Sequence, residues 1–268
     1  MFIYPIKSLG GISVETISVT DRGFRYDRRY MLVDEHNIFL TQREYPVMAL
    51  LQTAIDGNDL LIYHKNSIDL KLRLPLIPVH EGDVTRVQVW DDICEAICIS
   101  PLADEWFSER IGISCRLVYM PETSRRQVDN RYALEDEITS FADGYPVLMI
   151  GQSSLDDLNS RMQEVLPINR FRPNIVFTGG RPFEEDTMEH FIINGIHCYA
   201  VKPCARCVIT TTDQETGMTG KEPLKTLASY RRVNNEVWFG QNVLTKGSGF
   251  ISVGDSIEVI NTRTALLA

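Results

Sequence analysis

Two cysteines lie close together in the stretch Val201-Lys202-Pro203-Cys204-Ala205-Arg206-Cys207-Val208-Ile209-Thr210-Thr211-Thr212-Asp213. The β-branched run after the second cysteine predicts a strand, with the pair at its mouth. A Cys-x-x-Cys turn can hold both thiols on the same side of the backbone. The arginine between them favours the thiolate form, which binds soft metals and attacks electrophiles.

Other interpretations of this pair stay open from the sequence. Two cysteines beside a strand are often small buried hydrophobic residues. Thioredoxin-like chemistry requires the pair at the start of a helix, whereas a strand is predicted here. A zinc ribbon requires a second pair, and the other cysteines are better explained as structural. They are Cys94, Cys98, Cys115 and Cys198. The functional interpretation that is left is one metal-ligating or nucleophilic cysteine.

The composition is that of an ordinary soluble protein. The chain has 268 residues, 44% hydrophobic and 24% charged, which suffices for one large domain or two modest ones. No apolar run approaches the roughly 18 residues of a membrane helix, and the N-terminus lacks a signal-peptide pattern. Six unevenly spaced cysteines favour a reducing cytoplasm. The net charge of −9 argues against nucleic acid as a partner. We therefore expect a cytoplasmic protein without membrane or nucleic-acid partners.

Residues 1–120 predict a barrel-like antiparallel domain. Short alternating or β-branched segments are separated by turn residues. These segments are 1–4, 14–19, 50–55, 60–63, 68–72 and 84–89. Residues 56–59 predict a hairpin turn, and apolar residues at helical spacing predict a helix over 102–111. The polar, charged region 121–137 marks the expected domain boundary.

Residues 121–268 predict a second domain, again mostly β with a few helices. The expected strands are 147–150, 175–177, 196–201, 236–239, 250–253 and 256–260. One helix is predicted from Ser154, as its N-cap, with Asp157 at the third position, and a shorter one over 223–227. The first helix has the apolar face Leu155, Leu158, Met162 and Val165. The acidic runs 156–157 and 184–186 are assigned to a helix N-terminus and a solvated loop. The expected fold class is mostly β (α+β).

Four cationic residues occupy tight, turn-like contexts: Lys7, Arg28, Arg172 and Arg206. Each of them alone could be an ordinary surface charge, so the sequence motifs around them determine whether they are interpreted as binding residues. The run 202–213, Gly217, 221–227 and 239–242 closely resemble the MOSC domain, the family of the molybdenum-cofactor sulfurase C-terminal region. The motifs around the first two cations resemble the MOSC N-terminal domain, so the resemblance covers nearly the whole chain.

Within this family, the chain is most similar to the amidoxime-reducing components and their bacterial YcbX-type relatives, which reduce N-hydroxylated compounds. The resemblance implies a MOSC N-terminal β-barrel-like domain over residues 1–120. It also implies that residues 121–268 form a MOSC β-barrel domain that carries the cofactor cysteine.

The resemblance further implies a molybdenum cofactor, Mo-molybdopterin, with Cys207 as its metal ligand and as the catalytic residue. Arg206 is expected to help keep Cys207 ionised, and Cys204 to pack behind it. The family positions that hold the phosphate and pterin correspond here to Lys7, Ser8, Arg28 and Arg172. A dianionic phosphate suits a guanidinium fork, an ammonium and a hydroxyl donor.

Other cofactor-binding positions are implied at Asp143, Gly144, Tyr145, Asn174, Arg206 and Asn242. In the loop 143–145, glycine and tyrosine replace the small hydroxyl residues of the relatives, so backbone contacts are expected there. Because the implied residues come from both halves of the chain, the cofactor is expected to lie between them.

The implied function is reduction of the N–O bond in a small N-hydroxylated substrate. Nothing in the chain resembles a flavin or nicotinamide site, so electrons are expected from a separate donor protein of the flavin reductase, ferredoxin or cytochrome type. The alternatives are a sulfur carrier or cofactor-handling protein with a persulfide on Cys207, and a cofactor-free binding protein. Pyridoxal phosphate binding is a further property that the resemblance to the sulfurases implies.

Overall fold

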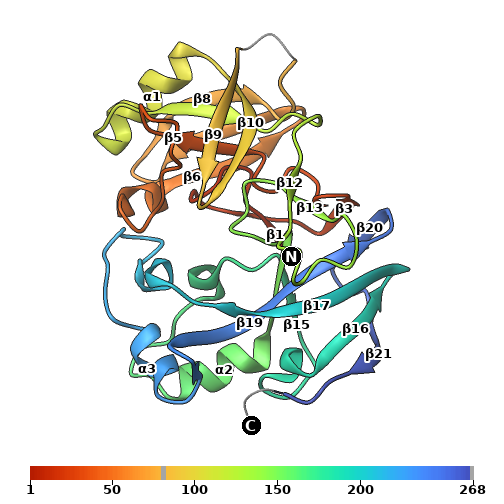
Figure 1. Ribbon diagram of the computed structural model, residues 1–268. Helices are drawn as coiled ribbons and strands as arrows, with labels where there is room; N and C mark the ends of the chain where they lie inside the picture. The colour runs from red at the N-terminus through yellow and green to blue at the C-terminus, as the bar shows by residue number, and fades with distance from the viewer. Residues whose placement is uncertain (80–82, 266–268) are drawn as a thin grey trace.

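The computed structural model describes residues 1–79 and 83–265. The chain forms two stacked β-rich halves, the upper one red to yellow and the lower one green to blue (Figure 1). The N-terminus lies where the two halves meet (Figure 1). The predicted mostly β fold, with barrel-type sheets in both halves, is confirmed.

Two antiparallel sheets form the N-terminal half. The first has the order β5-β11-β10-β9, with bounds Tyr30–Val33, Arg116–Tyr119, Asp92–Cys98 and Val84–Val89. The second has the order β6-β7-β8, with bounds Leu51–Asp56, Asp59–His64 and Ser67–Pro75. Strands β6 and β7 form the predicted hairpin.

One α-helix, α1 (Pro101–Ile111), covers this half, and a 3-10 helix, η1 (Pro46–Leu50), precedes β6. The prediction of a helix over 102–111 is confirmed. The Ser100 hydroxyl accepts from the backbone N–H of Ala103, and Gly112 ends the helix in a left-handed conformation. Phe107 is fully buried and belongs to the core between the two sheets.

A single large sheet organises the C-terminal half. Its order is β15-β14-β19-β17-β16-β21, with β18 paired to β19. The bounds in that order are Ile175–Phe177, Val147–Gly151, Glu236–Lys246, Ile196–Ala205, Met188–Ile193, Ile257–Thr262 and Arg232–Val233. Only the β14–β15 pair is parallel among the described strands. The helices are α2 (Gln152–Ser160), α3 (Leu224–Ala228) and the 3-10 helices η2 (Ile168–Phe171), η3 (Glu184–Asp186) and η4 (Val208–Thr211).

Three small sheets complete the described fold, and one of them joins the two halves. The order β20-β3-β4 pairs Gly249–Ser252 with Thr16–Thr20 and Gly23–Phe24. The two-stranded sheets are β1 (Phe2–Ile3) with β2 (Ile12–Ser13), and β12 (Arg126–Gln127) with β13 (Ile138–Thr139). Ile3, Ile17 and Phe24 are buried in the same cluster as Phe191 and Val243. Part of the N-terminal segment therefore packs into the C-terminal core, while Ile6 and Leu9 pack into the N-terminal core. The division at residue 120 stays a prediction.

Phe24→Ala is expected to lower the free energy of unfolding by about 3–5 kcal/mol, because it leaves a cavity where both halves meet. Phe24 on β4 is 1% exposed, whereas Phe250 on β20 of the same sheet is 60% exposed. Phe250→Ala is the matched control and is expected to change stability by less than about 0.5 kcal/mol. Denaturant unfolding of both variants measures the difference. If Phe24→Ala destabilised the protein no more than Phe250→Ala does, the burial of Phe24 between the halves would contribute nothing to stability.

Several local predictions are wrong. Among them are the assignment of 156–157 to a helix N-terminus and of Met162 and Val165 to a helix face, since 156–157 lie within α2 and Met162 and Val165 lie beyond its end. The run after the cysteines is the 3-10 helix η4, not a strand, and β17 precedes the pair. The hydroxyls of Thr210 and Thr211 donate to the carbonyls of Cys207 and Val208. These local bonds stabilise a helical turn in place of a strand.

The predicted helix from Ser154 begins earlier, at Gln152, because the Ser154 hydroxyl donates to buried Glu185 instead of capping the helix. That carboxylate also accepts from the backbone N–H of Gly151. The run 184–186 is therefore not a solvated loop. Asp186 is buried as well, and it accepts hydrogen bonds from Arg231 and Gln241.

Candidate cofactor site

All eleven predicted site residues line one cleft between the two halves. They are Lys7, Ser8, Arg28, Asp143, Gly144, Tyr145, Arg172, Asn174, Arg206, Cys207 and Asn242. The cleft has a cavity volume of about 110 Å³ and is partly open to solvent. Its lining also includes Phe171, Cys204 and Thr210, which the sequence did not single out for cofactor contact. Residues far apart in the chain are thus brought together.

Arg172 is the most distinctive cation of the cleft. Its residue is 8% exposed, and its Nη2 is buried without a hydrogen-bond partner. Its side chain forms no ion pair among the described residues. Burial lowers the pKa of Arg172 to about 10. A buried, unpaired guanidinium is costly, so its presence in a cleft indicates a binding site for an anion.

Tyr4 contacts two of the three guanidinium groups that line the cleft, although no sequence pattern marked it. The guanidinium carbon of Arg28 lies 4.5 Å from the Tyr4 ring centroid and that of Arg172 lies 4.3 Å from it. The Tyr4 hydroxyl donates to the carbonyl of Pro173 at 3.1 Å. The ring thereby stabilises both cations and fixes where their donors point.

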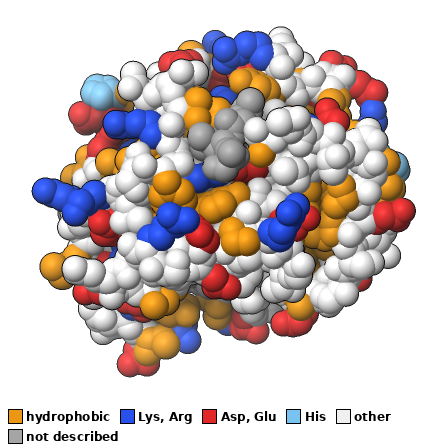
Figure 2. All heavy atoms as spheres, turned by 90° about the horizontal axis from the view of Figure 1, so that it is seen from below, with side chains coloured by type: hydrophobic (Ala, Val, Ile, Leu, Met, Phe, Trp, Pro, Cys, Tyr) orange, Lys and Arg blue, Asp and Glu red, His pale blue; other side chains and the backbone are white. Residues whose placement is uncertain are grey.

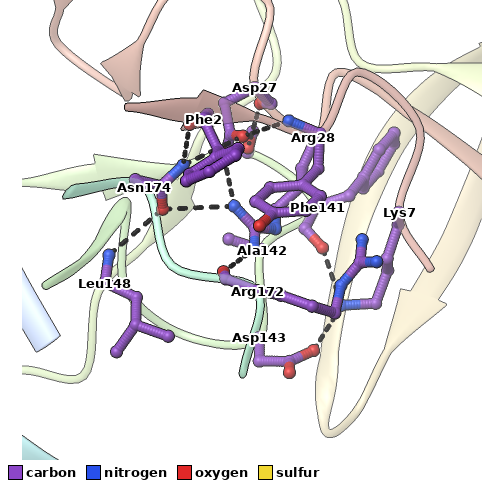
Figure 3. A network of polar contacts seen from close by, with 12 residues as sticks. Phe2, Lys7, Asp27, Arg28, Phe141, Ala142, Asp143, Leu148, Arg172 and Asn174 are labelled. Atoms are coloured by element: carbon purple, nitrogen blue, oxygen red, sulfur yellow. Dashed lines mark hydrogen bonds and ion pairs between the residues drawn. The ribbon is translucent and has the colours of Figure 1, made fainter. Parts of the chain in front are cut away.

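Asp27 is the other residue missed, and it neutralises only one of these cations. Arg28 Nη1 donates to Asp27 Oδ2 at 2.6 Å, while the backbone N–H of Tyr4 and Asn174 Nδ2 donate to Oδ1 (Figure 3). Asp27 is 1% exposed. Its position directly before Arg28 in the Tyr26-Asp27-Arg28-Arg29 run was the available signal. Arg28 is therefore a fixed, paired group, in contrast to Arg172.

Asn174 joins the halves through its side chain (Figure 3). Its Nδ2 donates to the carbonyl of Phe2 and to Asp27, and its Oδ1 accepts from Leu148 N and Arg28 Nη1. All donor and acceptor positions of the amide are engaged within the protein. Asn174 lines the cleft, but its amide positions the walls and has no free group for a ligand.

Lys7 supplies the ammonium of the site. Its Nζ donates to the Phe141 carbonyl at 2.8 Å and to Asp143 Oδ1 at 2.5 Å (Figure 3). The Lys7 side chain is 5% exposed and that of Asp143 is 64% exposed. Burial lowers the pKa of Lys7 to about 8, although Asp143 acts in the opposite direction. Lys7 is thus charged at neutral pH and loses its proton in the mildly basic range.

Anion binding in the cleft is expected to weaken as the pH rises through 8, because Lys7 is protonated below that pKa and neutral above it. Sulfate is the suitable probe, since its own charge is constant over this range. Loss of one charge-assisted bond weakens affinity by about tenfold or more. Calorimetric titration at pH 7 and pH 9 measures this. In Lys7→Met the pH dependence is expected to disappear, and its persistence there would contradict the assignment.

Three positions around the cleft have positive φ angles at non-glycine residues. Ser8 has φ 67°, Arg28 has φ 50° and Arg172 has φ 55°. Such left-handed backbone is unfavourable for side-chain-bearing residues and tends to cluster at functional sites. In each case a polar or cationic side chain that lines the cleft is placed by this backbone.

Cys207 lies just beyond the end of β17, at the N-cap position of η4. It is half-buried, and among the described residues its sulfur has no hydrogen-bond partner. Arg206 makes no hydrogen bond to Cys207 among the described residues, and its expected support of the Cys207 thiolate stays a prediction. Arg206 Nη1 donates to the Cys204 sulfur at 3.0 Å, and Nη2 donates to the Phe171 carbonyl at 2.6 Å. The guanidinium thus faces the first cysteine of the pair.

The remaining predicted residues form the side of the cleft next to β17 and β19. Asn242 Nδ2 donates weakly to the Pro203 carbonyl at 3.4 Å. The space around the Gly144 α-carbon is open, and the Tyr145 hydroxyl is buried without a partner. The open backbone at Gly144 agrees with the expectation of backbone contacts in this loop.

These residues fit a pterin cofactor with an anionic phosphate. Arg172 offers an unsatisfied buried donor, Lys7 and Arg28 add charge, and Cys207 offers one free sulfur in the same cleft. In the described ranges 1–79 and 83–265, no group of three or more His, Cys, Asp or Glu side chains could hold a metal ion by itself. A metal at Cys207 would thus need most of its ligands from the cofactor.

One face of the molecule gives no further assignment. The face seen from below mixes basic, acidic and hydrophobic side chains (Figure 2). No helix within the described part of the chain has the length and apolar character to cross a membrane. Location in the cytoplasm stays a prediction.

Comparison with known proteins agrees with the resemblance noted above. Residues 1–114 match the MOSC N-terminal beta barrel domain, and residues 136–258 match the MOSC domain. The chain is 31% identical over 278 residues to mitochondrial amidoxime-reducing component 1 of Mus musculus, covering 97% of this chain and 81% of that protein. It is 31% identical to mitochondrial amidoxime reducing component 2 of Bos taurus, covering 98% and 79%.

A third relative is the molybdenum cofactor sulfurase of Oryza sativa subsp. japonica, 32% identical over 259 residues, which cover 90% of this chain and 31% of that protein. Both matched domain families are MOSC families, and neither supports the expected pyridoxal phosphate binding. The full-length similarity and the two consecutive domain matches show that this chain belongs to the MOSC family, with a MOSC N-terminal β-barrel domain followed by a MOSC domain.

Proposed function

We propose that this protein is a molybdenum-cofactor-dependent oxidoreductase that reduces the N–O bond of small N-hydroxylated compounds. One observation carries the proposal: a single cleft joins the buried, unpaired Arg172 to the free sulfur of Cys207. The relatives named as amidoxime-reducing components support the choice of reaction. Two electrons and two protons convert an N-hydroxy compound to the parent amine or amidine and water.

The chain's own residues would bind and orient the cofactor. When bound, molybdopterin with its molybdenum supplies the two-electron chemistry. Arg172, Arg28 and Lys7 would hold the anionic phosphate, and Tyr4 and Asp27 would keep the guanidinium groups in place. Cys207 would ligate the metal as a thiolate.

Turnover is expected to require a separate electron-donor protein, because no flavin or nicotinamide motif is present in the sequence. The experiment is expression in a host that makes molybdopterin, followed by metal and pterin analysis and an assay on an aromatic amidoxime. We expect stoichiometric molybdenum, no reduction with NADH alone, and reduction once a flavin reductase, ferredoxin or cytochrome-type donor is added. Stoichiometric cofactor without amidoxime reduction by any donor would contradict the proposed reaction.

A sulfur-carrier function is the alternative, favoured by the similarity to a molybdenum cofactor sulfurase and by the half-buried Cys207, which lines the cleft. It predicts a persulfide on Cys207, seen as the added mass of one sulfur atom that a thiol reductant removes. Finding that persulfide in protein that lacks molybdenum would favour the carrier over the reductase.

A further inference from the structure

A second cavity, of about 250 Å³, lies between the β3–β4 strands and the ends of β5 and β11. Its lining is rich in arginine: Ser18, Thr20, Arg22, Phe24, Arg25, Tyr26, Arg29, Ile77, Tyr119 and Glu122. It shares no lining residue with the cofactor cleft. Arg28 and Arg29 are adjacent in one loop, yet they line different cavities.

Two of these arginines are more than nine-tenths buried. Arg22 is 3% exposed and Arg29 is 9% exposed. Nε and Nη1 of Arg22 and Nε of Arg29 are buried without hydrogen-bond partners. Since buried donors in proteins are almost always satisfied, three unsatisfied ones around a single cavity require an explanation.

Support of the neighbouring loop explains only part of this arrangement. Arg22 Nη2 donates to the carbonyls of Glu122 and Ser124 at 2.8 and 2.7 Å, and Arg29 Nη2 donates to the Met120 carbonyl. These bonds fix residues 120–124. They use the Nη2 atoms and leave the other donors of Arg22 free.

The carboxylates nearby do not balance the positive charge. Glu122 is the one acidic residue among the lining residues, and its 2.8 Å ion pair goes to Arg29 Nη1. Its other oxygen lies 3.9 Å from Arg22 Nε, and Asp21 lies 4.0 Å from Arg22 Nη1, both too far for hydrogen bonds. Arg25 is exposed, stacks on Tyr26 at 5.0 Å and has no carboxylate partner among the described residues. Three guanidinium groups thus face one close carboxylate.

We propose that Arg22, Arg25 and Arg29 form a second anion-binding site, which takes a small oxyanion such as phosphate, either free or as the phosphate group of a larger molecule. An oxyanion in the cavity would accept from the free Arg22 and Arg29 donors, with Arg25 closing the open side. The Tyr119 ring, 5.0 Å from the Arg29 guanidinium carbon, fixes the back of the site. This site is independent of the molybdenum chemistry proposed above.

The test is calorimetric titration of the full chain with inorganic phosphate at constant ionic strength in chloride. Arg172→Ala serves as the background, because it weakens phosphate binding in the cofactor cleft. In the Arg172→Ala variant, one phosphate site is expected to remain, at Arg22, Arg25 and Arg29. Adding Arg25→Ala should weaken it by about tenfold or more. Adding Glu122→Gln should strengthen it several-fold, because that change removes the competing carboxylate.

Both added variants change exposed side chains and leave the core residues in place. The Glu122 side chain is 69% exposed, and glutamine keeps an oxygen that can accept from Arg29. Arg73→Ala, at an exposed arginine paired with Asp56 and Asp59, is the matched control and should leave phosphate binding unchanged. A phosphomonoester such as AMP tells the two sources apart: tighter binding than phosphate indicates a larger ligand, and weaker binding indicates the free ion. No phosphate site in the Arg172→Ala background, or equal affinity in all three added variants, would overturn the proposal.

Discussion

Cys207→Ala is expected to remove molybdenum from the purified protein and to abolish reduction of N-hydroxylated compounds, while the fold stays intact. Cys207 is half-buried at the N-cap of η4, and its sulfur makes no hydrogen bond among the described residues that the substitution would break. The cost in stability should therefore be small. The loss of function should be complete, because the protein then offers the metal no thiolate at this position.

Cys204→Ala is the matched control for this prediction. Its sulfur accepts from Arg206 Nη1 at 3.0 Å, so its removal disturbs a positioning contact rather than the metal ligand. We expect reduced activity with molybdenum retained. Metal analysis, circular dichroism and the amidoxime assay distinguish the two variants. If Cys204→Ala lost the metal and Cys207→Ala kept it, the ligand would be the other cysteine.

Much of the fold could be predicted from the sequence, because alternating apolar residues and turn residues determine structure locally. The β6–β7 hairpin and α1 follow from residues within a few positions of each other. The joining of the halves did not follow from such signals. The pairing of β3 with β20 connects residues over 230 positions apart along the chain, Ile17 with Ile251 for example, and no local pattern specifies a partner at that distance.

The failed local predictions share one physical cause. Thr210, Ser154 and Glu185 were assigned from propensity, and each was decided by a hydrogen bond to its surroundings. A hydroxyl that can either cap a helix or pair with a buried carboxylate looks the same in sequence. A tertiary contact made the choice for Ser154 and Glu185, whereas Thr210 bonds locally to the Cys207 carbonyl.

The sequence allowed prediction of which residues line the candidate site, but not of which of their charges are paired. The resemblance selected Arg28 and Arg172 as equivalent phosphate ligands. The structure shows that Arg28 is paired with Asp27, whereas Arg172 has an unsatisfied donor. That difference depends on Asp27, which pairs with Arg28 alone and which no family motif quoted from the sequence had marked. It leads to a second prediction.

Arg172→Ala is expected to lower the pterin content of the purified protein without loss of stability. The removed guanidinium forms no ion pair among the described residues and is buried, so the cofactor-free variant should be as stable as the wild type or more stable. Loss of its charge-assisted bond to an anion costs about 1.5–3 kcal/mol of binding free energy, or roughly ten- to hundredfold in affinity.

Arg28→Ala should behave differently, because it leaves the buried Asp27 carboxylate without its guanidinium. Breaking such a pair costs about 3–5 kcal/mol, so this variant should lose both pterin and stability. Arg161→Ala, at an exposed arginine paired with Asp157, is the control that should change neither. Pterin released on denaturation and the midpoint of denaturant unfolding are the two measurements. The prediction fails if Arg172→Ala keeps its full pterin content, or if it destabilises the cofactor-free protein as much as Arg28→Ala does, because Arg172 would then be a structural residue and not a ligand for the phosphate.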